Sequence, residues 1–291
     1  MREVFYKSFK DTISEKFWNF IGGGAGSVIA ILLIAKNFFD QKPQNSIVIG
    51  LGGVLGIYLF RFVLFFFKHI YKYWYYLYKE SVYGDAIIFL KEAFSWVHWL
   101  RKLDEIPDDK FIATMAFMCH QLKLIYDKKT NSKCSVSIKV AIETVITANT
   151  EVVNLCRDKN SLHRDTKTYQ NTQHLIFANT CFNNILSHLT KNKKSKLYYI
   201  NNDIPSSKDY ENTSKECYID GILPYKSELV VPIIPLHIEQ DKVYNLLGFL
   251  CVDCSEKSMF DEKYDLAILQ GVADGIYDII CIRNSHKSKN K

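Results

Sequence analysis

The sequence lacks the short motifs on which most enzymes of nucleotide, ester and metal chemistry depend. Its 291 residues contain no GxxxxGK[ST] phosphate loop, no GxSxG nucleophile turn, no HExxH pair and no protein-kinase motif set. One CxxC is present, from Cys251 to Cys254, and in a loop it would suit zinc or a redox disulfide. It falls at the end of an apolar strand, where positions three apart face opposite ways, and no second ligand pair accompanies it. We expect no enzyme, no metal and no other cofactor.

A strong charge imbalance and a disulfide pattern are also missing. Lys and Arg number 37 against 31 Asp and Glu, which gives a formal net charge of +6. This excess is too small to indicate nucleic acid by itself, and it suits contact with anionic lipid headgroups. The eight cysteines are irregularly spaced, so we expect reduced thiols in a cytoplasmic domain.

Two long apolar stretches lie close together near the N-terminus. The first covers about residues 18–35, and the second covers about 46–67 with Arg61 as its one charge. A membrane span needs roughly 20 apolar residues, because the hydrocarbon layer is about 30 Å thick and a helix rises about 1.5 Å per residue. The short polar link between them contains Pro43. The pattern predicts a membrane helical hairpin.

Basic residues flank this hairpin on both outer sides, before residue 18 and after residue 67. By the positive-inside tendency, both chain termini then lie in the cytoplasm and the protein is a two-span inner-membrane protein. A cleaved signal peptide is not expected, because no A-x-A site follows the first apolar stretch and a second one comes at once.

Small residues recur four apart inside the two predicted spans, as Gly22 with Gly26 and Gly52 with Gly56. Such pairs let membrane helices approach closely, although glycine is common in spans in any case. Arg61 is costly in lipid. It either extends towards the cytoplasmic headgroups or lines a polar path in an oligomer.

Lysines alternate with aromatic residues over 68–79 (KHIYKYWYYLYK). Tyr, Trp and Lys collect at membrane interfaces, which is the preferred interpretation. Stacking of bases on the aromatic rings is the alternative. We take 68–109 as a juxtamembrane helical linker, with a helix at about 83–103 and a new helix starting near Pro107.

The pattern changes after residue 133. Alternating apolar residues predict strands over 134–143 and 151–158, and a helical period predicts a helix over about 168–189. A long polar loop at 198–225 precedes two further strands. The first of these, from 228, is expected to be an edge strand or a bulged strand because it contains Pro232 and Pro235. A last helix is predicted from about 261 to 283.

The C-terminal part contains a recognisable series of motifs: Tyr225-Lys226-Ser227 before an LVVPI strand, an LGFLCVD strand at 247–253, and Phe260-Asp261-Glu262 opening the last helix. This order resembles the C-terminal half of a GAF domain. The resemblance covers about 110–283, most clearly the last 65 residues or so, and leaves 284–291 as a basic tail. It implies an α+β fold, with an antiparallel sheet, helices packed on one face and often a small-molecule pocket on the other.

The long loop would cap this pocket. Its aromatic and amide side chains suit a small-molecule or nucleotide-like ligand, or they simply cap and fix a surface loop. The candidate ligand-binding residues are Asn202, Asp203, Tyr210, Asn212, Tyr218 and Tyr225. The extended signature of cyclic-nucleotide GAF domains is not matched. GAF relatives that reduce methionine sulfoxide use several cysteines around the pocket; Cys217 and Cys251 could approach one another there, but their spacing does not match that pattern.

A GAF domain behind two spans resembles, in architecture, membrane effectors of bacterial anti-phage systems. That resemblance implies a homo-oligomeric effector that senses a trigger and disrupts the inner membrane. The alternative is a membrane anchor that carries a GAF signalling or docking module. The expected partners are membrane lipid, a small ligand, and a separately encoded sensor protein or a nucleoprotein.

Overall fold

The computed structural model describes residues 2–12, 43–143, 146–164, 174–191, 197–236 and 246–289. It divides into two compact units, Met1–Ser81 and Val82–Lys291, which are described separately below. The first predicted membrane span, with Gly22 and Gly26, lies outside the described residues.

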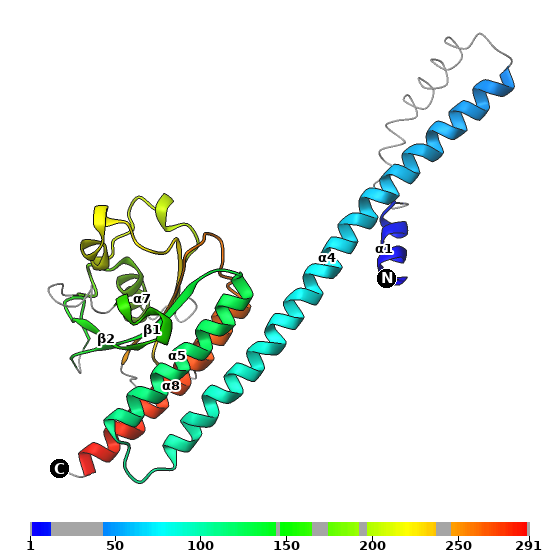
Figure 1. Ribbon diagram of the computed structural model, residues 1–291. Coiled ribbons are helices and arrows are strands. Elements are labelled where there is room, and N and C mark those ends of the chain that lie inside the picture. Colours follow the sequence, from blue (N-terminus) through cyan, green and yellow to red (C-terminus); the bar gives the residue numbers. More distant parts are fainter. Residues whose placement is uncertain are drawn as a thin grey trace. The chain divides into compact units, whose positions relative to one another are not determined.

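The N-terminal unit contains helix α1 (Arg2–Thr12) and the first part of helix α4 (Pro43–Arg101), which is 59 residues long (Figure 1). Pro43 is the first residue of α4, where its missing N–H would have no helical partner in any case. The second predicted span, the aromatic segment and the helix predicted at 83–103 are all parts of this one helix.

Helix α1 packs on α4. The rings of Phe5 and Phe62 lie 5.3 Å apart, and the ring of His69 lies 2.8 Å from a carboxylate oxygen of Asp11. This part of α4 exposes many large apolar side chains, among them Leu59, Phe60, Leu64, Phe67, Tyr71 and Trp74. Within the described ranges, none of the helices combines the length and the apolar character that crossing a bilayer requires.

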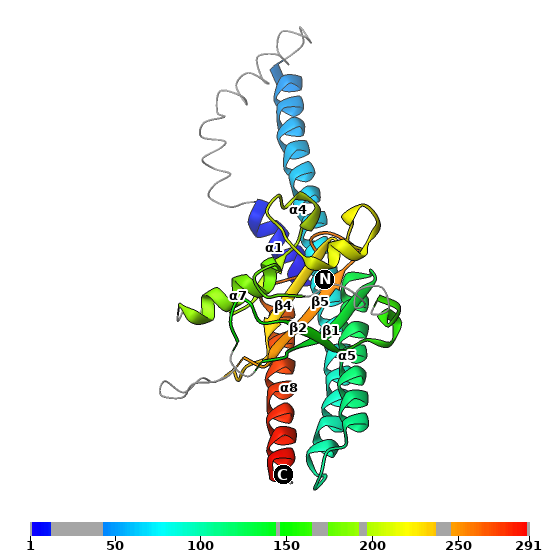
Figure 2. The ribbon, with the colours of Figure 1, turned by 90° about the vertical axis from the view of Figure 1, so that its left-hand side faces the viewer.

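The second unit is built on a five-stranded antiparallel sheet in the order β2-β1-β5-β4-β3. The strands are β1 (Cys134–Ala141), β2 (Val152–Arg157), β3 (Tyr199–Asn201), β4 (Ser227–Pro232) and β5 (Gly248–Cys254). Helices α5 (Asp108–Thr130) and α8 (Tyr264–Lys289) run along one side of the sheet (Figures 1 and 2). Helix α7 (Thr180–Thr190) packs on the other face.

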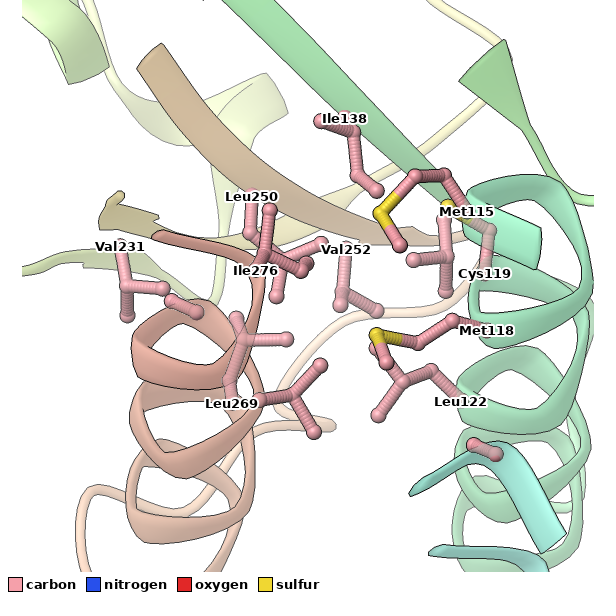
Figure 3. Close-up of a cluster of buried hydrophobic side chains, with 14 of the residues drawn as sticks. Met115, Met118, Cys119, Leu122, Ile138, Val231, Leu250, Val252, Leu269 and Ile276 are labelled. Carbon is pink, nitrogen blue, oxygen red and sulfur yellow. The ribbon is translucent and has the colours of Figure 1, made fainter. Parts of the chain in front are cut away.

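Successive side chains of a strand point to opposite sides of a sheet. The face under α5 and α8 is apolar, whereas the face under α7 has charged side chains beside a smaller apolar cluster and is called the polar face below. On β5, Leu250 and Val252 face α5 and α8, whereas Cys251 and Asp253 face the other way. Figure 3 shows the apolar side, where side chains of α5, α8 and three strands point towards one another. The labelled residues are Met115, Met118, Cys119, Leu122, Ile138, Val231, Leu250, Val252, Leu269 and Ile276.

The last part of α4 belongs to this core. Ala86, Ala93, Val97 and Leu100 are buried at helical spacing against α5 and α8. Ion pairs join the same helices at the surface, Asp85 with Lys128 and Arg101 with Asp278. Because the end of α4 packs on and forms ion pairs with both α5 and α8, it is part of the sheet domain.

The central strand β5 begins with a glycine because the backbone of β1 leaves no room for a side chain at that position. A Cβ atom at Gly248 would lie 2.0 Å from the carbonyl oxygen of Lys139. A side chain at this position therefore requires β1 and β5 to separate.

Three predictions about the elements are wrong. Of the helix predicted over 168–189, residues 168–173 lie outside the described residues, and α7 begins at Thr180. Residues 174–176 instead pair with the chain at the start of β2: the Val152 N–H donates to the carbonyl of His174, and the Ile176 N–H donates to that of Thr150. Strand β4 lies inside the sheet, and Pro232 is tolerated because it is the last residue of the strand. The segment 198–225 is not an irregular loop, since it forms β3 and three short 3-10 helices: Ile204–Ser206, Thr213–Cys217 and Ile219–Gly221.

Candidate functional site

A small cavity lies on the polar face of the sheet, under α7 and the segment 197–226. Its volume is about 50 Å³. The strands contribute Ser137 and Lys139 from β1, Arg157 from β2, Glu228 from β4 and Asp253 from β5. Most protein pockets for drug-sized ligands measure roughly 300–1,000 Å³, so this cavity suits a group of only a few atoms.

Asp253 forms a buried ion pair in the cavity wall. The Arg164 Nη1 atom donates to both of its carboxylate oxygens, at 2.9 and 3.1 Å. The guanidinium also lies over the ring of Tyr225, 5.4 Å from the centroid. Burial opposes the charge on Arg164, but the adjacent Asp253 more than offsets this and raises the pKa of Arg164.

Glu228 is a second acid in the same wall and is only 5% exposed. Burial raises its pKa to about 8; a hydrogen bond from Tyr210 acts against the shift, and the charge of Asp253 adds to it. Its Oε1 atom is buried and has no hydrogen-bond partner among the described residues. A buried acceptor without a partner costs roughly 1–3 kcal/mol, so a ligand that donates a hydrogen bond there would remove a real penalty.

Four of the six predicted ligand-binding residues come together at this site. Asn212, Tyr218 and Tyr225 line the cavity. Tyr210 lies behind them: the Asn212 amide nitrogen is 3.0 Å from the hydroxyls of both Tyr210 and Tyr225. The Tyr218 hydroxyl is a second buried polar atom for which the described part of the chain supplies no hydrogen-bond partner.

The other two predicted residues have structural roles away from the cavity. Asn202 donates to the carbonyl of Phe260 at 2.9 Å and accepts from its N–H at 3.0 Å, which fixes the chain before α8. Asp203 caps the 3-10 helix that starts at Ile204 and pairs with Lys257 at 2.7 Å. For these two residues, the capping interpretation is the one that the contacts favour.

The cysteines at the cavity are Cys181 and Cys251, and Cys217 is not among its lining residues. Burial raises the pKa of Cys181 well above the ordinary range and that of Cys251 to about 12. Thiols in this state are poor nucleophiles, because the thiolate is the reactive form. Within the described part of the chain, no group of three His, Cys, Asp or Glu residues could hold a metal ion.

Of the residues predicted to pack membrane helices, Gly52, Gly56 and Arg61 lie on α4. A Cβ atom at Gly56 would meet no atom of the described residues within 4 Å, and the Arg61 guanidinium lies over the ring of Phe65 at 5.3 Å. Their role in membrane packing stays a prediction.

Five charged residues that line the cavity were not among the predicted site residues: Lys139, Arg157, Arg164, Glu228 and Asp253. For two of them a signal was present. Glu228 and Asp253 are acids inside apolar strand segments, and alternation places them on the face opposite Leu229 and Val252. Arg164 follows a short helix and gave no such signal.

No protein-family model matches the sequence, and no curated protein matches it either. Solved structures with a similar chain path include GAF domains of phosphoenolpyruvate-protein phosphotransferases. The one from Coxiella burnetii is 13% identical over 70% of this chain and 98% of its own, with a TM-score of 0.42. The one from Acinetobacter is 11% identical over 67% and 94%, with a TM-score of 0.41.

Another such structure is the free methionine-R-sulfoxide reductase from Neisseria meningitidis in complex with its substrate. It is 14% identical over 69% of this chain and 93% of its own, with a TM-score of 0.41. The similar structures include both GAF domains and a methionine sulfoxide reductase.

Proposed function

We propose that residues 82–289 form a GAF-like ligand-sensing domain, and that α4 carries its state to the N-terminal segment. The observation that supports this most directly is the cavity on the polar face of the sheet. It combines a buried acceptor without a partner, Oε1 of Glu228, with the predicted side chains of Asn212, Tyr218 and Tyr225.

The ligand in this proposal is small and polar, with a hydrogen-bond donor that reaches Glu228. A cavity of about 50 Å³ has no room for a nucleotide. The raised pKa values of Cys181 and Cys251 favour binding over thiol catalysis.

Contacts connect the segment over the cavity to α4. Asn202 holds Phe260, and the Asp261 N–H donates to the carboxylate of Asp265 at 2.6 Å. Asp265 in turn pairs with Lys129 and lies 3.5 Å from the hydroxyl of Tyr83 on α4. A ligand that moves the segment 197–226 would therefore act on the residues that hold α4.

The test is a screen of small polar metabolites against the full-length protein by thermal shift and calorimetry. We expect a hit to stabilise the wild type and to bind Glu228→Ala and Asn212→Ala variants at least tenfold more weakly. Lys226→Ala changes an exposed residue beside the same strand and serves as the matched control. A ligand that binds all four proteins equally would rule out this cavity as the sensing site.

We also propose that residues 1–67 place the protein in the inner membrane, since two apolar stretches of suitable length occur there. Partition of the protein into the membrane fraction, resistant to carbonate extraction, tests this. Recovery in the supernatant would contradict it.

Whether this segment disrupts the membrane or only anchors the domain needs a separate experiment. Exchanging residues 1–67 for an unrelated two-span segment preserves an anchor and abolishes an effector, with membrane potential as the readout. No observation of the structure bears on a role in defence against phage, which stays a prediction from architecture.

A further inference from the structure

Two buried cysteines stand directly opposite each other in the sheet, on the face away from the cavity. Cys134 is the first residue of β1, Cys254 is the last of β5, and the two are register partners. Both belong to the apolar core under α5 and α8, and they are 3% and 0% exposed.

The hydrogen-bond pattern of the strands fixes the kind of pairing. Ser255 N–H donates to the carbonyl of Lys133 at 3.0 Å, which makes residues 133 and 255 a hydrogen-bonded pair. Such pairs alternate with non-hydrogen-bonded pairs along an antiparallel ladder, so Cys134 and Cys254 form a non-hydrogen-bonded pair.

This pairing brings two side chains as close as a sheet allows. In a non-hydrogen-bonded pair the Cα atoms are about 4.5 Å apart, and disulfides are found at Cα separations of about 4.4–6.8 Å. The two cysteines can therefore be bridged without moving either strand.

We propose that Cys134 and Cys254 are a redox-active pair, which a small peroxide converts into a disulfide across the ends of β1 and β5. The inference is independent of the ligand cavity. The oxidant has to be small because both sulfur atoms are buried in the core, where a bulky disulfide reagent has no access.

The chemistry starts at Cys254. A hydrogen bond from Cys134 lowers the pKa of Cys254 to about 7, although burial acts against this shift, so a thiolate is present near neutral pH. The thiolate attacks one peroxide oxygen and the O–O bond breaks. The products are a sulfenic acid on Cys254 and, after protonation, water or an alcohol.

The Cys134 sulfur then attacks the sulfenic sulfur atom. The S–S bond forms, the S–O bond breaks, and the hydroxyl leaves as water with the proton of Cys134. The two sulfur atoms together lose two electrons, and the peroxide gains them.

A second pair of cysteines offers an internal comparison. Cys119 on α5 and Cys156 on β2 have sulfur atoms 4.0 Å apart. Burial and the hydrogen bond with Cys156 raise the pKa of Cys119 well above its ordinary value, and that pair connects a helix to a strand instead of two paired strands. We expect it to react much more slowly than Cys134 with Cys254.

The experiment uses the reduced full-length protein, treated with hydrogen peroxide in modest excess, alkylated, digested and analysed by mass spectrometry. We expect a reducible cross-link between the Cys134 and Cys254 peptides, both in the wild type and in a Cys119→Ser/Cys156→Ser variant. The oxidised protein should unfold roughly 5 °C or more above the reduced protein, because the bond closes a long loop. In Cys134→Ser no thiol remains to resolve the sulfenic acid, so dimedone that is present while the protein is unfolded should label Cys254.

Either of two results would overturn the proposal. One is that Cys134 and Cys254 remain fully alkylatable while other cysteines are oxidised. The other is that the cross-link joins Cys119 to Cys156 and spares the strand pair.

Discussion

Glu228 and Asp253 stand directly opposite each other on β4 and β5, and both line the cavity on the polar face of the sheet. Two carboxylates facing each other in a buried site cannot both hold a charge cheaply. The structure resolves this by giving Asp253 a guanidinium partner and leaving Glu228 with a raised pKa. The site therefore has an ion pair between Arg164 and Asp253 and, beside it, one proton on Glu228 that it can release.

The first prediction is a pH dependence of stability that Glu228 controls. Its pKa is raised from 4.5 to about 8 in the folded state. Between these values the folded protein keeps a proton that the unfolded chain has lost, so the free energy of unfolding falls as pH rises and levels off above about 8. The loss approaches about 1.4 kcal/mol per pH unit within this window.

Urea unfolding of the wild type and Glu228→Gln from pH 5 to pH 9 measures this contribution. The variant cannot ionise, so it should lose less stability than the wild type as pH rises. Glu256→Gln, an exposed change beside the same strands, should retain the wild-type slope. Equal slopes for the wild type and Glu228→Gln would show that Glu228 has an ordinary pKa.

The sequence predicted the strands well because alternation is a local signal. The segments at 134–141 and 152–157 and the two later strands are all present, and the motif glycine Gly248 lies where a side chain would overlap the backbone of Lys139. The error in α7 has a non-local cause. Residues 174–176 have helix-compatible side chains, but their backbone bonds are used by the start of β2.

The candidate site was predicted only in part, because only some of its residues have a local sequence signal. Tyrosine and asparagine in a long polar segment pointed to Asn212, Tyr218 and Tyr225, which line the cavity. No local sequence signal distinguishes these three residues from Asn202, which holds Phe260, or from Asp203, which caps a 3-10 helix. The pairing of Arg164 with Asp253 joins residues 89 positions apart and depends on the folded sheet.

The second prediction concerns this ion pair. The side chains of Arg164 and Asp253 are 14% and 18% exposed, so removing one partner leaves the other charge largely buried. We expect Asp253→Asn to lower the free energy of unfolding by about 3 kcal/mol. The exposed pair Lys226–Glu256 is the control, and Glu256→Gln should change stability by less than about 0.5 kcal/mol. Similar losses for the two variants would mean that the Arg164 pair is screened by water.

The third prediction tests the close approach at the start of β5. A methyl group at Gly248 would overlap the backbone of Lys139, and backbone cannot rotate away as a side chain can. Gly248→Ala should therefore cost about 3 kcal/mol or more in urea unfolding, as overpacking and a broken strand pair do. Gly84→Ala on α4, where the new methyl group would meet nothing within 4 Å, should be neutral or slightly stabilising. A folded Gly248→Ala protein of wild-type stability would contradict the pairing of β1 with β5.

The last prediction uses two glycines one turn apart on α8 to test how α4 packs on the sheet domain. At Gly271 an added Cβ would meet nothing within 4 Å, whereas at Gly275 it would lie 2.7 Å from the ring of Phe94 on α4. Gly271→Ala should stabilise the protein by about 0.5–1 kcal/mol, which is the difference in helix propensity. Gly275→Ala has the same propensity gain but displaces Phe94, so we expect it to be about 1–2 kcal/mol less stable than Gly271→Ala. Chemical denaturation measures both, and a Phe94→Ala/Gly275→Ala double variant should recover the helix gain relative to Phe94→Ala alone. If the two glycine variants unfold at the same urea concentration, α4 does not pack against α8 at this position.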